Sequence, residues 1–334
     1  MTADAVPEAV SGGAATGSLT PAVRAVAVAR PVVDLLRGAG CVARVHSAFP
    51  RAINLLIGQR LLALTSVGAP TVPNGISLAC QENHPALLGV RPGQEAWVGD
   101  GEISFPQSGL RVVTGHAELW EPSLAEHLDL VDAIGLARGL QHLAAILTGA
   151  SAGRPSQSWH HLLRAPVAGI DLHLLRQRLT DGVDRLAAGL ARGDPSEVVS
   201  SARGLAGLGP GLTPAGDDLL VGACVALSLI ASANPAATRS VERLLYLRQL
   251  VAAVALARTT ALSAVWLEHA GTGEFAQPVL ALAQALASGQ AREVTVAAAT
   301  LMRYGASSGR CTLGGLLAIG QALTARLSHV IGAR

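Results

Sequence analysis

The stretch "GLGPGLTPAGDDLLVG", residues 207–222, places glycines and prolines before two adjacent aspartates and then continues into an apolar segment. Thr213 followed by Pro214 predicts a helix start, with Thr213 as the N-cap and Pro214 at the first helical position. Asp217 and Asp218 then fall in the first turn, where the helix dipole favours negative charge. Capping alone would explain both aspartates.

The segment after the aspartates, "LLVGACVALSLI", is apolar on every side, which indicates a helix buried all round. If its start is also buried, at least one aspartate should meet an arginine, a metal ion or the hydrogen-bond donors of a ligand. Gly209, Gly211 and Gly216 would let the backbone approach such a ligand closely. With the free N–H groups of the helix start, they predict an anion-binding loop.

Composition narrows the classes of protein to consider. The chain has 334 residues, of which 50% are hydrophobic, 3% aromatic and 14% charged, enough for two domains with sizeable cores. A net charge of +2 without a basic stripe argues against nucleic-acid binding. The four cysteines form no CxxC pair and fit a reducing cytoplasm.

Membrane insertion is not expected. The apolar runs 219–233 and 250–267 are too short or too polar to span a bilayer, so we interpret them as buried core helices. The first twenty residues lack the features of a signal peptide. The sequence therefore predicts a cytoplasmic protein with no membrane partner.

The chain divides into two parts with different patterns of apolar and turn residues. Residues 1–22 predict a disordered tail, and residues 23–122 contain short apolar runs between turns such as Pro73-Asn74-Gly75 and Gly99-Asp100-Gly101, typical of strands. Residues 123–334 show helical spacing, clearest over 124–149 and 171–193, with an exposed connection at 149–158. We expect an α+β protein in which a mostly antiparallel β domain precedes a larger all-helical domain.

A second stretch, "SSGRCTLGGLLAIG" at 307–320, resembles the first. When Gly216 is set on Gly309, Asp217 matches Arg310 and Asp218 matches Cys311. The match covers a dozen residues, so chance is an alternative to a true repeat. A true repeat would bring two helix N-termini to one small polar or anionic ligand, with Asp217 paired to Arg310.

The segment 258–279 carries the remaining candidates. Thr259 and Ser263 are four residues apart and would share one face of a helix, although such hydroxyls often only bond the carbonyl one turn back. His269 is either a general base or a group that satisfies the last carbonyls of its helix. We expect Glu268 and Glu274 to be solvated.

Three motifs in this order, "GLGPGLTPAGDD", "TTALSAVWLEHAGTGEFAQPV" and "GASSGRCTLGG", resemble the AllH-type subunit of bacterial oxamate carbamoyltransferase and its broader, mostly uncharacterised family. The resemblance covers most of the chain after residue 40. It implies a subunit that acts with FdrA-like and AllG-like partners in anaerobic allantoin breakdown, converting oxalurate and phosphate to oxamate and carbamoyl phosphate. Cys311 stands where the resemblance leads us to expect an acidic residue, which weakens a metal-binding interpretation.

In the preferred scheme, the loop amides and Arg310 bind phosphate or carboxylate, while Asp218 accepts N–H groups of the carbamoyl amide. The predicted catalytic residues are Asp217, Asp218 and His269. The predicted substrate-binding residues are Gly209, Gly211, Thr213, Gly216, Ser307, Ser308, Gly309, Arg310, Thr260, Ser263 and Asn54. The ligands to consider are phosphate, carbamoyl phosphate, oxamate and oxalurate.

Two alternatives stay open. One is a non-catalytic subunit whose loops complete an interface. The other is a metal-dependent hydrolase or lyase, although adjacent carboxylates on a helix point about 100° apart and chelate one ion poorly. No cofactor is predicted, and a divalent metal such as Mg²⁺ is not favoured. Cys311 follows a helix start that would lower its thiol pKa, but a lone cysteine is more often structural.

Overall fold

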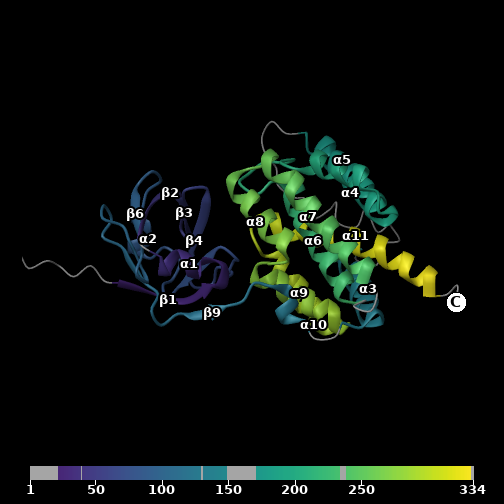
Figure 1. The fold of residues 1–334 in the computed structure, drawn as a ribbon, viewed down its shortest axis with the longest axis horizontal. Coiled ribbons are helices and arrows are strands. Elements are labelled where there is room, and N and C mark those ends of the chain that lie inside the picture. Colours follow the sequence, from purple (N-terminus) through teal and green to yellow (C-terminus); the bar gives the residue numbers. More distant parts are fainter. Residues whose placement is uncertain (1–21, 39, 129–130, 149–170, 234–237, 332–334) are drawn as a thin grey trace, which may run out of the picture.

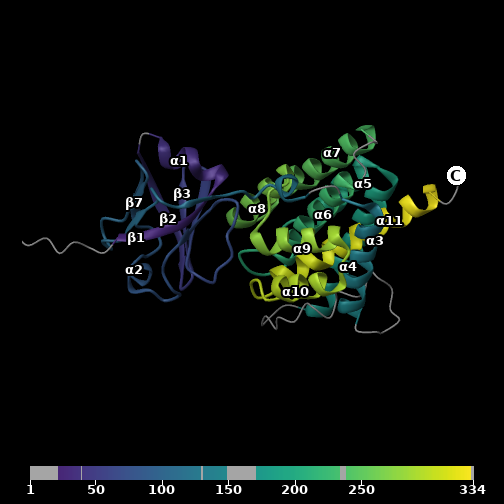
Figure 2. The ribbon, with the colours of Figure 1, turned by 90° about the horizontal axis from the view of Figure 1, so that it is seen from below.

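The computed structural model describes residues 22–38, 40–128, 131–148, 171–233 and 238–331. The strands gather at one end of the molecule and the helices at the other, in two views at right angles (Figures 1 and 2). This confirms the α+β class. The predicted tail, apart from Ala22, and the predicted connection at 149–158 lie outside the described residues.

The strand region is a single sheet that closes on itself. Its order is β5-β4-β3-β2-β6-β7-β8-β1-β9, and an additional antiparallel pairing of β1 with β5 turns it into a barrel. Most neighbours are antiparallel, as expected, but β4–β5, β1–β8 and β1–β9 are parallel. The strands are β1 (Ala22–Ala29), β2 (Cys41–Phe49), β3 (Ala52–Ile57), β4 (Arg60–Thr65), β5 (Gly75–Leu78), β6 (Glu95–Gly99), β7 (Glu102–Ser104), β8 (Arg111–Val113) and β9 (Glu118–Trp120).

Local sequence explains the hairpins of the barrel. Asp100 and Gly101 join β6 to β7 with φ angles of 52° and 74°, a pair of left-handed residues suited to a tight hairpin turn. The predicted turn at Gly99-Asp100-Gly101 is therefore confirmed. Short helices α1 (Val33–Arg37) and α2 (Pro85–Leu88) complete this region.

The larger part of the molecule is helical. After a 3-10 turn at Leu124–His127, its helices are α3 (Ala133–Thr148), α4 (Leu172–Arg192), α5 (Pro195–Leu205), α6 (Ala215–Ser232), α7 (Thr238–Ala255), α8 (Ala261–Thr272), α9 (Gln277–Ser288), α10 (Ala291–Met302) and α11 (Ser308–Ile331). Asp171 caps α4 through the amides of His173 and Leu174, and Gly193 ends it with a φ of 63°. These caps confirm the helix predicted over 171–193.

Helix α6 is the centre of the helical region and packs against α11, α7 and α8. Among the described residues it is the one helix long and apolar enough to cross a membrane, but 89% of it is buried inside the protein. A core helix of a folded protein passes the same test. The prediction that the run 219–233 is a buried core helix is confirmed.

Two predicted helix boundaries are wrong. Helix α6 begins at Ala215, Pro214 holds the N-cap position in an extended conformation with ψ of 142°, and Thr213 makes no capping bond. The apolar run 250–267 is not one helix, because α7 ends at Ala255, a 3-10 turn covers Leu256–Arg258 and α8 begins at Ala261. Both differences arise where the chain bends to bring polar side chains together.

The barrel and the helical region meet along the turn between α8 and α9. The amide of Gln277 donates to the carbonyl of Thr71 in the β4–β5 loop at 3.0 Å, and the amide of Phe275 donates to the carbonyl of Pro122 at 2.9 Å. Trp120, at the end of β9, packs against both hydrophobic cores. Helix α8 is the helix that faces β4 (Figure 1).

Candidate functional site

The two glycine-rich loops meet in the structure. The hydroxyls of Thr213, before α6, and Ser308, at the start of α11, lie 2.9 Å apart. The predicted convergence of the two helix N-termini is therefore observed. Thr213 serves this contact between loops instead of capping its own helix.

The two loops also share one local construction. The amide of Gly216 donates to Leu208 O at 2.9 Å, and the amide of Gly309 donates to Tyr304 O at 3.0 Å. A side chain at Gly216 would collide with the carbonyl of Leu205, the last residue of α5. One at Gly309 would collide in the same way with the end of α10, so the two stretches form a structural repeat.

The same repeat governs the crossing of the two core helices. A Cβ at Gly222 of α6 would meet the backbone of Thr312 in α11, and a Cβ at Gly315 of α11 would meet the backbone of Leu219 in α6. Each helix thus presents a glycine to the backbone of the other. This close approach fixes the two helix starts on one side of the helical region.

Asp217 makes its hydrogen bonds within the protein and connects segments that are distant in the sequence. It is fully buried, its Oδ1 accepts the amide of Gly207 at 2.8 Å, and its Oδ2 accepts the hydroxyl of Thr259. Burial raises the pKa of this carboxyl, while the bonds from Thr259, Gly207 and Ser263 act in the opposite direction. The predicted pair with Arg310 is wrong, because donors from two other segments occupy the carboxylate.

Asp218 is also buried, but its hydrogen bonding differs from that of Asp217. Only 2% of the residue is exposed, and none of the described residues donates a hydrogen bond to its Oδ2. Burial raises the pKa of Asp218 well above its ordinary value, an effect opposed by the hydroxyl of Ser308 and reinforced by the charge of Asp217. A buried carboxyl oxygen without a donor costs free energy that a ligand can recover.

Asp218 lines a cavity between the helical region and the barrel. The volume of the cavity is about 30 Å³, which is room for a group about the size of a water molecule, such as an amino group. Its walls come from α6, α8, α9, α11, the turn before α9, the segment between α10 and α11 and the β4–β5 loop. The lining residues are Pro73, Asp218, Val221, Trp266, Glu274, Phe275, Ala276, Val279, Tyr304 and Thr312.

The lining is apolar except for two carboxyl groups, a phenol, a hydroxyl and an indole N–H, and it contains no lysine, arginine or histidine. Trp266 and Tyr304 stack with their ring centroids 5.8 Å apart. Burial, and then the negative charge of Asp218, raise the pKa of the Tyr304 phenol. The cavity therefore suits an uncharged group rich in N–H donors better than an anion.

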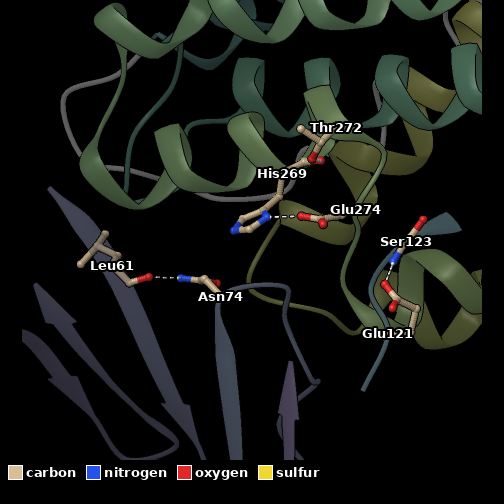
Figure 3. A network of polar contacts seen from close by, with 7 residues as sticks. All are labelled: Leu61, Asn74, Glu121, Ser123, His269, Thr272 and Glu274. Atoms are coloured by element: carbon tan, nitrogen blue, oxygen red, sulfur yellow. Dashed lines mark hydrogen bonds and ion pairs between the residues drawn. The ribbon is translucent and has the colours of Figure 1, made fainter. Parts of the chain in front are cut away.

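His269 holds the second carboxylate of the cavity. Its Nδ1 lies 2.6 Å from Oε2 of Glu274, and the side chains are 17% and 25% exposed (Figure 3). Glu274 is thus half-buried and partnered, so the prediction that it is solvated is wrong. His269 itself is not among the lining residues, which leaves it beside the site and in contact with it through Glu274.

The other predicted residues fall into three places. Thr260 caps α8 by accepting the amide of Ser263 at 3.2 Å and donates its hydroxyl to Leu212 O. Asn54 donates to Ser47 Oγ at 2.9 Å across β2 and β3 and does not line the cavity. Gly209 and Gly211, with φ angles of 121° and 98°, shape the outer part of the first loop.

Internal hydrogen bonds leave fewer free amides in the predicted anion-binding loop than the sequence suggested. The amides of Gly216 and Gly309 already donate to carbonyls, and the amide of Cys311 donates to Ser307 O at 3.0 Å. Of the first loop, Gly211 and Leu212 are exposed and Gly209 and Thr213 are half-buried. Residues 209–213 are therefore open to a ligand or partner, with the most exposed positions at Gly211 and Leu212.

Cys311 does not have the lowered pKa considered from the sequence. It is 1% exposed, and burial followed by the charge of Asp218 raises its thiol pKa, against a smaller opposing effect of Arg310. The helix start does not offset these effects. Cys311 is buried in the core cluster of the helical region.

Among the described residues, no group of three or more histidine, cysteine or acidic side chains is arranged to hold a metal ion. Of the ten lining residues, sequence reasoning predicted only Asp218 as a site residue and missed, among others, Pro73, Trp266, Tyr304, Thr312 and, as a partnered group, Glu274. For Thr312 the sequence did offer a signal, because this residue lies three positions after Gly309, within the second of the two similar stretches. Pro73 carried none, because its role depends on how the barrel docks.

The fold and the site define a two-part α+β protein, in which a strand barrel and a helical body enclose a cavity lined in part by two carboxyl groups. The family model described as oxamate carbamoyltransferase subunit AllH matches residues 205–320, and that of the AllH family N-terminal domain matches residues 24–119. The chain belongs to the AllH family. Comparisons with curated proteins and with solved structures find no match.

Proposed function

We propose that the chain is the subunit of an oxamate carbamoyltransferase that binds the carbamoyl group, and that Asp218 is the residue that receives it. The observation that carries this proposal is the buried Oδ2 of Asp218, which lacks a donor and lines a cavity about the size of an amino group. A carbamoyl –NH₂ supplies the missing donor. Hydrogen bonding to a buried acceptor is strong because water does not compete there.

The reaction proposed is phosphorolysis of oxalurate to oxamate and carbamoyl phosphate, or its reverse. The reacting carbon passes through a tetrahedral state with negative charge on oxygen, so rate depends on position and on donors aimed at that oxygen. Asp218 would fix the amide end of the carbamoyl group. Residues 209–213 and Arg310, beside the Thr213–Ser308 contact, are the proposed site for phosphate or carboxylate.

Other subunits are part of this proposal. The cavity lining carries no cation, although every proposed substrate carries negative charge. We propose that FdrA-like and AllG-like partners contribute further positive groups when they cover the exposed loop 209–213. The complex would act in the cytoplasm, in allantoin breakdown.

A thermal-shift titration of the full chain tests the proposal. Phosphate, carbamoyl phosphate, oxamate and oxalurate are added with and without Mg²⁺ to the wild type, to Asp218→Asn and to Asp181→Asn, the same change at an exposed position of α4. A ligand that binds only the folded state raises the unfolding midpoint by mass action. We expect a shift with a carbamoyl compound that Asp218→Asn abolishes and Asp181→Asn retains.

The opposite result has a defined meaning. If none of the four compounds shifts the midpoint of the wild type, the chain does not bind substrate by itself. The loops would then serve an interface with partner subunits, and Asp218 would have no role in recognising the carbamoyl group.

A further inference from the structure

We infer that Glu274, held in place by His269, makes the cavity select a carbamoyl –NH₂ group over a methyl group of similar size. This inference rests on the proposed function and adds a second residue that determines specificity. Glu274 lines the same cavity as Asp218 but comes from the turn between α8 and α9. An –NH₂ group has two N–H donors, and the cavity offers two carboxylates from different elements to receive them.

The turn that carries Glu274 is held by backbone bonds on several sides. Its amide donates to His269 O at 2.9 Å, and it forms an isolated bridge with Ser123 of the connecting segment. Gly273 adopts a φ of 90° at the C-cap of α8, and its carbonyl accepts the amide of Leu124 at 2.9 Å. The backbone of Glu274 is therefore fixed before any ligand arrives, which lowers the cost of binding.

A buried arginine holds the end of α8, directly before the turn that carries Glu274. Arg248 of α7 is 9% exposed, and its Nε donates to Gly271 O at 3.0 Å while Nη1 donates to Ser228 Oγ at 2.9 Å. It thus ties the end of α8 to α6 and α7. The position of Glu274 depends on this frame as well as on its own contacts.

The side chain of Glu274 is oriented by His269. The 2.6 Å contact between His269 Nδ1 and Glu274 Oε2 uses one of about four lone-pair sites on the carboxylate, so further sites remain for a ligand N–H (Figure 3). A methyl group in the same place would give neither carboxyl group a further donor, and the Oδ2 of Asp218 would stay unpaired. Sites built around buried polar groups reject analogues that lack the matching donor.

The test compares two stable ligands that differ only in this group. Phosphonoacetamide carries –CO–NH₂ and acetonylphosphonate carries –CO–CH₃, and the binding of each to the full chain is measured by calorimetry. We expect the wild type to bind the amide at least about 10-fold more tightly. Glu268→Gln, the same change at an exposed position of α8, should keep this ratio.

Glu274→Gln should reduce the ratio to within about 3-fold by weakening the amide alone. Its single amide oxygen is engaged by His269, and its –NH₂ then faces the donor of the ligand. His269→Asn, which retains a side-chain N–H, should give an intermediate ratio.

Four outcomes would overturn the inference. A ratio unchanged in Glu274→Gln means that Glu274 does not select the ligand. Equal weakening of both ligands means that its role is structural. Loss of amide binding in Asp218→Asn, together with an unchanged ratio in Glu274→Gln, would leave the proposed function standing while this inference falls. Binding of neither ligand by the wild type would refute both.

Discussion

Asp217 and Asp218 are neighbours in the sequence with the same side chain and opposite roles. Asp217 accepts hydrogen bonds from Gly207 and Thr259, whereas the Oδ2 of Asp218 has no donor among the described residues. The sequence predicted that at least one of the pair needs a partner. It could not assign the roles, because the partners of Asp217 come from separate segments that only the fold brings together.

Asn substitutions at the two positions should therefore change stability in opposite directions. Asp217→Asn turns an –NH₂ toward a donor and should lower the free energy of unfolding by about 1.5–3 kcal/mol. Asp218→Asn removes a buried carboxyl group whose Oδ2 has no donor among the described residues, and it should raise the free energy of unfolding by about 1 kcal/mol at pH 8. Urea denaturation of both variants measures the two effects, and a loss of similar size in both would contradict the assigned roles.

The raised pKa of Asp218 makes a second prediction, on pH. The folded state holds the proton of this carboxyl to higher pH than the unfolded state, so its contribution to stability is complete below about pH 4 and is lost as pH rises through the folded pKa. The Asp218→Asn variant has no carboxyl group at this position, so it does not lose stability in this way as pH rises. The stability of the variant relative to the wild type should consequently increase between pH 5 and pH 8, and a constant difference would show that Asp218 ionises normally.

The element that organises the site is the pair α6 and α11. Gly222 and Gly315 let the helices approach to backbone contact, and the equivalent glycines 216 and 309 let each helix start lie against the preceding helix. The repeat was visible in the sequence as a match of a dozen residues. Its meaning was not, because the close crossing of the helices is a tertiary feature.

Gly222→Ala should separate these helices and destabilise the protein by about 2 kcal/mol or more, since its Cβ would meet the backbone of Thr312. Gly204→Ala is the matched control. Gly204 is an exposed residue of α5 with open space around its Cβ position, so alanine there should stabilise by up to about 1 kcal/mol. Thermal unfolding distinguishes the two, and equal effects would argue against a tight crossing.

At the scale of the whole molecule, the site lies where the barrel docks on the helices. Pro73 of the β4–β5 loop closes one side of the cavity, and Thr71 accepts the amide of Gln277. Composition and turn patterns were sufficient to predict a strand half and a helical half. Barrel closure and docking were not predicted, because they depend on contacts such as β1 with β5 that are distant in sequence.

Ligand binding should therefore slow hydrogen exchange in both the barrel and the helical region. Hydrogen exchange with and without phosphonoacetamide should show added protection over 66–78 and 271–280, which flank the cavity, because binding disfavours local opening there. Residues 95–113, on β6 to β8, serve as the internal reference. Protection confined to the helical region would mean that the barrel does not contribute to the site.

The most direct measurement of the central claim is the rate of phosphate-dependent cleavage of oxalurate by the complex reassembled from this chain and its FdrA-like and AllG-like partners. Asp218→Asn should assemble normally and lower kcat/KM by about 100-fold or more, as expected for loss of a buried group that positions the reacting carbamoyl. Asp181→Asn should match the wild type. A wild-type rate in the Asp218→Asn complex would show that the carbamoyl group is bound elsewhere.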